Sequence, residues 1–206
     1  MRVALCAVME SPSRAWPLVK RWIDQATNEV TTLPADPAGG ERALEALEVT
    51  ERSVLGALAL HTGGLSIDHG GLRVLGGPAL LDWRDHVKGG LIVGHDVVAG
   101  FYSVDKQDGE VRYLAPDTLE WEGTEMGHAA WVHWTLTGEI GAFYEALRWP
   151  GWEDESAPLA PDTGLQIQPP PFTREGRLIA ESTKTATPMA ELWSAQKEYV
   201  RQYVGD

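Results

Sequence analysis

Three short apolar runs separated by turn residues form the centre of the chain: Leu91–Val93, Phe101–Val104 and Val111–Leu114. Runs of this length, rich in Val, Ile, Tyr and Phe and broken by Gly and Asp, are typical of β-strands joined by tight connections. Asp108-Gly109 suits a primed hairpin turn, because Gly accepts positive φ without a Cβ clash. The stretch Leu91–Trp121 is therefore predicted to form an antiparallel meander.

Helical periodicity dominates the residues before this meander. Pro17 favours a first helical turn, and the apolar residues that follow it recur on one helical face. Two shorter helices are predicted, at 41–48 and, capped by Ser53, at 54–61. The turn Asp68-His69-Gly70-Gly71 then separates two predicted strands, Leu65–Asp68 and Leu72–Leu75.

After the meander the pattern returns to helices, predicted at Ala129–Leu136 and Ile140–Leu147. The Pro-rich, acidic residues 153–171 read as a linker. Within it, Leu165–Gln168 is predicted to be an edge strand that pairs with Leu178–Ser182. A final helix is predicted from Pro188, capped by Thr187.

These elements predict an α+β fold, with a mainly antiparallel sheet flanked by helices and one core for 206 residues. Residues 1–14 are interpreted as an unstructured leader, with Met1 or Met9 as the start. Residues 15–152 would form the domain. Residues 153–206 would add a linker, an edge hairpin and a helix, either as part of the core or as a cover over a binding face.

The composition narrows the classes of function. The only cysteine, Cys6, permits no intrachain disulfide, which favours a reducing, cytoplasmic setting. No apolar run approaches the ~20 residues of a membrane span. The net charge of −13 opposes nucleic-acid binding through phosphate neutralisation.

The negative charge is concentrated in one region. Residues 108–155 hold 11 acids against Arg112 and Arg148. Such a surface would attract a basic partner, although solubility alone also explains an acidic protein. Nine tryptophans are present, most of them expected in the core. The residues predicted to meet a partner are Asp108, Glu110, Asp117, Glu120, Trp121 and Glu122.

The sequence carries no reaction motif: Gly-x-Ser-x-Gly and the glycine-rich phosphate-binding patterns are absent. His61, Asp68, His95 and Asp96 form the one set that suggests a small-molecule pocket or a His–carboxylate metal site. Their spacing does not support a metal site, and histidines that cap turns or pack at strand ends explain them more simply. We therefore expect no catalytic residue, metal or cofactor.

Several segments resemble a bacterial family of unknown function. They include His61-Thr62-Gly63-Gly64-Leu65 with Ile67-Asp68-His69-Gly70 and Leu72-Arg73, the run from Leu114 to Glu122 (LAPDTLEWE), and the run from Leu147 to Glu153 (LRWPGWE). The resemblance covers nearly the whole chain after the leader. It implies no activity.

A looser resemblance reaches the SUKH superfamily, the relatives of Smi/Knr and Syd. It rests on the order of helix, glycine turn and strand pair, then LIVGHDVVAGFYSVD, GEVRYLAPD and the aromatic helix HAAWVHWTL. It implies an α+β fold with a mainly antiparallel sheet and a protein-binding role. Many bacterial members neutralise nuclease toxins by direct contact.

The leading hypothesis is a non-enzymatic binding protein, monomeric or a small homo-oligomer, that acts as an immunity protein by covering a basic toxin with its acidic face. A housekeeping regulatory interaction module is the second hypothesis. A small-molecule-binding enzyme that uses His61, Asp68, His95 and Asp96 is the third, and it requires these four residues to share one pocket.

Overall fold

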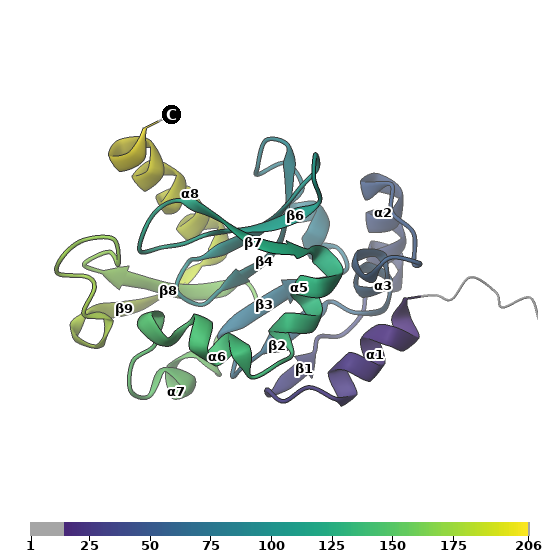
Figure 1. The fold of residues 1–206 in the computed structure, drawn as a ribbon, viewed down its shortest axis with the longest axis horizontal. Helices are drawn as coiled ribbons and strands as arrows, with labels where there is room; N and C mark the ends of the chain where they lie inside the picture. The colour runs from purple at the N-terminus through teal and green to yellow at the C-terminus, as the bar shows by residue number, and fades with distance from the viewer. Residues whose placement is uncertain (1–14, 206) are drawn as a thin grey trace, which may run out of the picture.

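The computed structural model, which describes residues 15–205, contains a seven-stranded antiparallel sheet in which every strand pairs with its neighbours in sequence (Figure 1). This confirms the predicted α+β fold. The strands are β1 (Val30–Thr32), β2 (Gly64–Ile67), β3 (Leu72–Leu75), β4 (Gly90–Asp96), β5 (Phe101–Asp105), β6 (Glu110–Leu114) and β7 (Trp121–Gly127).

The predicted meander is strands β4 to β6, but the turn between β5 and β6 differs from the prediction. Val104 pairs with Val111, and the chain reverses over a longer loop than a two-residue primed turn. Only Gly109 has positive φ there, at 75°. The side chains of Asp105 and Asp108 accept hydrogen bonds from the backbone N–H groups of Gln107 and Glu110, and so stabilise the longer loop.

Both edge strands escaped the sequence pattern. β1 has three residues that lie shortly before Pro34. β7 has the polar sequence WEGTEMG, of which only Trp121 falls within the predicted meander. An edge strand that faces solvent needs no apolar run. Pairing with β2 and β6 holds these strands in place instead.

Helices cover one face of the sheet, which carries Tyr102 and Tyr113 and is called the tyrosine face. Trp131 of α5 contacts Tyr102 there, and Tyr144 packs beside it. The helices that precede the C-terminal elements, apart from α4, are α1 (Trp16–Asp24), α2 (Pro37–Leu47), which packs on α3, α3 (Val54–His61), α5 (His128–Thr135), α6 (Glu139–Phe143), the 3-10 turn η1 (Glu145–Leu147) and α7 (Trp152–Ser156), which lies at the β2–β3 turn.

Two helix starts show where sequence patterns succeed and fail. Ser53 caps α3 as predicted, accepting a hydrogen bond from the Gly56 N–H. α2 begins at Pro37, four residues before the predicted start at Glu41, with Asp36 as its cap. Gly39 and Gly40, poor helix formers, concealed this first turn. They are buried, and a Cβ at Gly40 would lie 2.5 Å from the Ala59 carbonyl oxygen.

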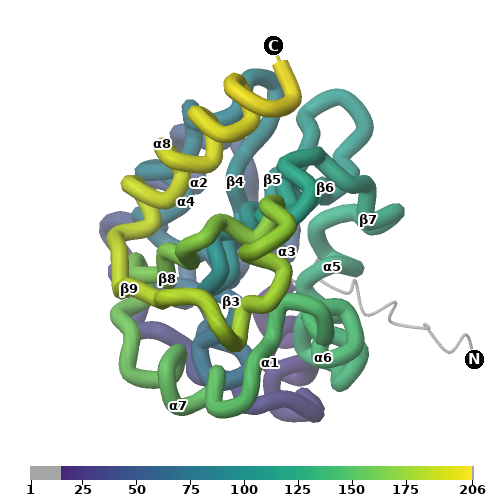
Figure 2. Tube along the Cα trace, turned by 90° about the vertical axis from the view of Figure 1, so that its left-hand side faces the viewer, coloured from purple at the N-terminus to yellow at the C-terminus, as the bar shows by residue number. Residues whose placement is uncertain are grey.

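The C-terminal elements pack on part of the opposite face, called the Phe101 face, as Figure 2 shows. Phe101 meets Trp193 at 4.9 Å between ring centroids, and Trp83 lies beside both. The Leu165 N–H donates to the Val97 carbonyl at 2.7 Å. The C-terminal elements are β8 (Thr163–Gln168), the 3-10 turn η2 (Ile179–Glu181), β9 (Thr183–Pro188), α8 (Met189–Tyr199) and the π-helical turn η3 (Val200–Val204), and the short helix α4 (Ala79–Asp82) leads into Trp83.

The predicted details of this region need correction. β8 pairs with β9, not with Leu178–Ser182, most of which forms η2 or the turn after it. Thr187 is a strand residue opposite Gly164 and does not cap α8. The 153–171 segment read as a linker contains most of α7 and all of β8. Leu165, Ile167, Met189, Leu192 and Trp193 all join the core of the sheet. The predicted leader, 1–14, lies outside the described residues.

Candidate functional site

A buried polar network lies on the tyrosine face. The Asp96 carboxylate accepts hydrogen bonds from the Tyr113 hydroxyl at 2.6 Å and from the Gly100 and Val98 N–H groups at 2.7 and 3.0 Å. Burial raises the pKa of Asp96, although the hydrogen bonds from Tyr113 and Gly100 act in the opposite direction. Since Asp96 is only 1% exposed, the network serves to stabilise the β4–β5 connection.

Arg148 extends this side of the molecule toward solvent. Its Nη2 lies 3.1 Å from Asp68 Oδ2 in the β2–β3 turn, and its guanidinium stacks 3.4 Å from the centre of the Trp152 ring. A Cβ at Gly71 would lie 2.5 Å from Arg148 Nη2, so only glycine admits the guanidinium here. Two segments singled out in the sequence, HTGGLSIDHGGLR and LRWPGWE, therefore meet and fix each other.

The four residues of the hypothetical small-molecule pocket are divided among several environments, although the Arg148 charge acts on both Asp68 and Asp96. His61 stacks on Trp16 at 5.0 Å. Asp68 binds Arg148. Asp96 faces the tyrosines, and His95, the preceding strand residue, points to the Phe101 face. The structure therefore does not assemble these four residues in one pocket.

His95 is a buried neutral histidine. It is 2% exposed and lies near the Trp83 and Phe101 rings. Burial, with a smaller contribution from the Arg73 charge, lowers its pKa to about 3. Arg73 donates hydrogen bonds to Ser66 Oγ at 2.6 Å and to the Leu159 carbonyl oxygen at 3.4 Å. A packing role explains both residues.

The predicted partner-binding residues gather at the β6–β7 edge, but on two faces. Trp121 lies opposite Leu114, which lies opposite Phe101, so Trp121 belongs to the Phe101 face. Glu122 lies opposite Tyr113 and belongs to the tyrosine face. Glu122 accepts a hydrogen bond from the Thr118 hydroxyl at 2.9 Å. Neighbouring residues of one strand cannot share a face, so the predicted surface wraps around the edge.

Arg112 is surrounded by carboxylates. It forms ion pairs with Asp105, with Asp108 at 2.6 Å and with Glu110 at 3.5 Å. The pKa of Asp105 lies below its usual range. The main cause is the hydrogen bond that its carboxylate accepts from the Gln107 N–H, and the ion pair with Arg112 adds to it. Asp108 and Glu110 were expected from the sequence. Asp105 was missed because it lies at the end of an apolar strand, before the acidic block begins.

β7 is an open edge strand whose second half is irregular. Glu110 pairs with Gly127 but Arg112 pairs with Gly123, so Thr124, Glu125 and Met126 form a bulge. Glu125 has φ of 57°, and its N–H donates to the Glu110 carboxylate at 2.8 Å. Such a bulge blocks continuous pairing with another sheet edge. The regular part, Trp121–Gly123, is the part left open to a partner.

We call this region the acidic edge. Its exposed members include Trp121, which is 39% exposed, and the glutamates at 120, 122 and 125. Glu125 was not predicted because no local sequence pattern indicates the bulge. The acidic edge consists of Asp105, Asp108, Glu110, Asp117, Glu120, Trp121, Glu122 and Glu125.

Two hollows border the acidic edge. The first, the Trp121 hollow, has a volume of about 280 Å³ and lies between Trp121, Arg112 and the Val87–Gly90 loop. The second, of about 390 Å³, lies between the Asp108-Gly109 turn and the β7 bulge. Both adjoin the carboxylates around Arg112.

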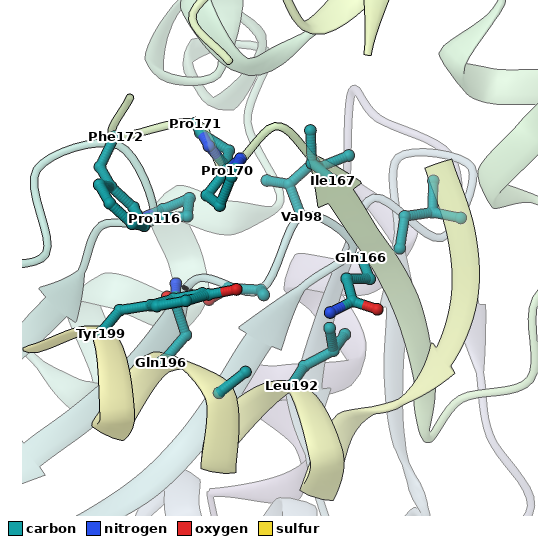
Figure 3. Close-up of a pocket in the computed structure, with 13 residues that line it drawn as sticks. Val98, Pro116, Gln166, Ile167, Pro170, Pro171, Phe172, Leu192, Gln196 and Tyr199 are labelled. Carbon is teal, nitrogen blue, oxygen red and sulfur yellow. Dashed lines mark hydrogen bonds between the residues drawn. The ribbon is translucent and has the colours of Figure 1, made fainter. Parts of the chain in front are cut away.

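A third depression lies under α8 and is lined by Pro170, Pro171, Phe172, Leu192 and Tyr199 (Figure 3). Its side chains nearly fill it: the free space is about 30 Å³, enough for one or two water molecules. The side chains of α8 therefore pack closely against the loop that carries Pro170 and Pro171.

Residues 15–205 contain neither a group of metal ligands nor a membrane-spanning helix. Among them, no three His, Cys, Asp or Glu side chains are grouped as a metal would require. None of the helices in that range is both long and apolar enough to cross a bilayer.

Comparison with known proteins places the chain in a family. The family model described as "Protein of unknown function DUF2625" matches residues 5–192. The chain belongs to the DUF2625 family. This confirms the bacterial family of unknown function expected from the sequence.

Two relatives extend over most of the chain. It is 32% identical over 204 residues to the "Putative uncharacterized protein YbfG" of Escherichia coli, covering 92% of this chain and 93% of the relative. It is 29% identical over 160 residues to an "Uncharacterized protein" of Haemophilus influenzae, covering 68% and 70%. No solved structure matches. The DUF2625 relatives therefore assign a family but no activity.

Proposed function

We propose that this protein is a non-enzymatic binding module that captures a basic protein partner at its acidic edge. The observation that carries the proposal is an open strand edge, within residues 15–205, whose exposed tryptophan lies among carboxylates that outnumber the nearby cations. Aromatic anchors surrounded by complementary charge are typical centres of protein interfaces.

Both arginines of residues 108–155 already bind carboxylates of this chain. Arg112 is bound by three carboxylates, and Arg148 is bound to Asp68 and stacked on Trp152. Neither neutralises the exposed glutamates of β7. A basic partner would therefore be steered toward this edge, and the attraction should weaken with salt.

The backbone of β7 supplies a second contribution. An extended segment of a partner can add to an open sheet edge through main-chain hydrogen bonds. The bulge at Thr124–Met126 limits this pairing to a short stretch around Trp121 and Gly123. The partner would thus be selected by charge and by a short, defined register.

The resemblance to the SUKH superfamily supports a finer proposal. Many of its bacterial members neutralise nuclease toxins, and nuclease active sites must attract a phosphate backbone. A carboxylate-rich edge around Trp121 offers such a site a competing acidic surface. On this basis the protein acts as an immunity protein by occlusion, and its partner is a basic toxin.

Charge reversal tests the proposal. The unaltered protein, a Glu120→Lys/Glu122→Lys/Glu125→Lys variant and a matched Glu41→Lys/Glu45→Lys/Glu191→Lys control would each be used to isolate partners from the source cells. Candidates would then be purified and their Kd measured at low and high salt. The control moves the same charge to exposed positions on α2 and α8.

We expect one basic protein to bind the unaltered chain and the control directly, with salt-dependent affinity, and to lose at least tenfold in Kd against the edge variant. Expression of the unaltered chain should protect cells from that partner. Equal binding by the edge variant, or the absence of any basic binder, contradicts the proposal.

A further inference from the structure

The Trp121 hollow differs from the rest of the acidic edge because a buried polar atom at its floor has no partner. Ser103 is 4% exposed, and its hydroxyl forms no hydrogen bond within residues 15–205. A Cβ at Gly90 would lie 2.4 Å from Ser103 Oγ, so a larger residue at position 90 would displace the hydroxyl. Buried hydroxyls are normally satisfied, and an unsatisfied one beside a hollow points to a ligand.

The charged groups in and directly behind the walls of the hollow carry a net negative charge. Asp105 and Arg112 line it, and Arg112 is already bound by Asp105, Asp108 and Glu110. Asp105 is the carboxylate that lines the hollow, beside Arg112 and Lys88, whereas Asp108 and Glu110 lie behind Arg112. Together these three carboxylates and two cations carry a net charge of −1. A carboxylate offers about four acceptor positions, so Asp105 can accept a further donor while holding Arg112.

Trp121 supplies the remaining wall. Its ring belongs to the Phe101 face, like Ser103 and Arg112, and it is 39% exposed. An aromatic face beside a carboxylate attracts guanidinium and ammonium groups through cation–π and ionic contacts. A volume of about 280 Å³ accommodates one long side chain.

We propose that the Trp121 hollow is a binding site for a single arginine or lysine side chain of the basic partner. The inference rests on the proposed function, and it adds where the partner's anchor enters. The side chain lies against the Trp121 ring, donates to Asp105 and reaches the Ser103 hydroxyl. Lys88, which is exposed, lies at the rim of the hollow.

Titration with small probes tests this site separately from the partner. N-acetyl-arginine methylamide, its lysine analogue and its glutamate analogue would be added to ¹⁵N-labelled protein. The indole N–H signal of Trp121, assigned by its loss in Trp121→Phe, is the readout. We expect the arginine and lysine compounds to move this signal saturably and the glutamate compound to leave it unchanged.

Ser103→Ala should weaken arginine binding about tenfold, the loss expected for a hydrogen bond to a charged group. Ser194→Ala, on the exposed side of α8, should not change it. A response to the glutamate compound alone, no response to either cation at saturating millimolar concentrations, or unchanged binding in Ser103→Ala would overturn the site. Capture of a basic partner without probe binding would reject the Trp121 hollow and leave the proposed function standing.

Discussion

The two faces of the sheet differ in whether the charged residues compared here are buried or exposed to solvent. On the tyrosine face, Asp96 is 1% exposed and satisfied by Tyr113 and two backbone N–H groups. At the open end of the Phe101 face, Arg112 collects three carboxylates that remain in contact with solvent. A satisfied buried network makes the fold specific, whereas exposed charges contribute little to stability and are available to a partner.

The largest effect should come from a matched pair of tryptophans. Trp131 is 0% exposed and packs on Tyr102, so Trp131→Ala should lower the free energy of unfolding by about 3–5 kcal/mol. Trp121→Ala on the open face should change it by less than about 1 kcal/mol. Urea unfolding measures both. Similar losses in the two variants would remove the distinction between the faces.

A matched pair of aspartates comes next. Asp96→Ala leaves the Tyr113 hydroxyl and the Val98 and Gly100 N–H groups without their acceptor, and should cost about 3 kcal/mol. Asp105→Ala removes an exposed carboxylate and should shift the urea midpoint far less. The account of the tyrosine face fails if Asp96→Ala is tolerated as well as Asp105→Ala.

His95 should make stability depend on pH. Its folded pKa of about 3 lies below the unfolded value of 6.5, so only the unfolded chain binds a proton between these values. Stability is full above pH 6.5 and falls as pH decreases toward 3, by about 2 kcal/mol at pH 5. The pH slope of urea unfolding should be shallower in His95→Gln and unchanged in the exposed control His86→Gln. Parallel slopes in all three proteins would contradict a buried neutral His95.

The smallest expected effect concerns the loop that carries Asp108. Gly109 has φ of 75° with open space around its Cα, so Gly109→Ala should cost about 1 kcal/mol through backbone strain alone. Gly141→Ala, in helix α6 and equally unobstructed, should be neutral or stabilising by up to about 1 kcal/mol. Thermal or urea unfolding distinguishes them. A neutral Gly109→Ala would show that the loop does not hold its turn rigidly.

Apolar periodicity and caps located the central strands because those segments carry their own pattern. The runs at 91–93, 101–104 and 111–114 are β4, β5 and β6, and Ser53 caps α3. The edge strands, the first turn of α2 and the pairing of β8 with β9 depend on contacts distant in sequence. Two buried glycines, a polar edge and a proline-rich segment carry no local signal for such contacts.

The candidate site, too, was predictable only where its residues belong to a local sequence pattern. The acid excess identified Asp108, Glu110 and Glu122 from composition, but it could not reveal that Trp121 and Glu122 point to opposite faces. That division follows from the β6–β7 register. Asp105 and Ser103 joined the site only through the fold, since neither belongs to the acidic block.

Photo-crosslinking tests the central claim most directly, because two aromatic residues of equal exposure lie on opposite faces. Trp121 is 39% and Phe143 40% exposed, and Phe143 contacts Tyr113 on the tyrosine face. A photoreactive phenylalanine analogue would replace each one in the source cells. The account predicts a discrete adduct with a basic protein from position 121 and none from position 143. An adduct from position 143 alone, or from neither position, would contradict it.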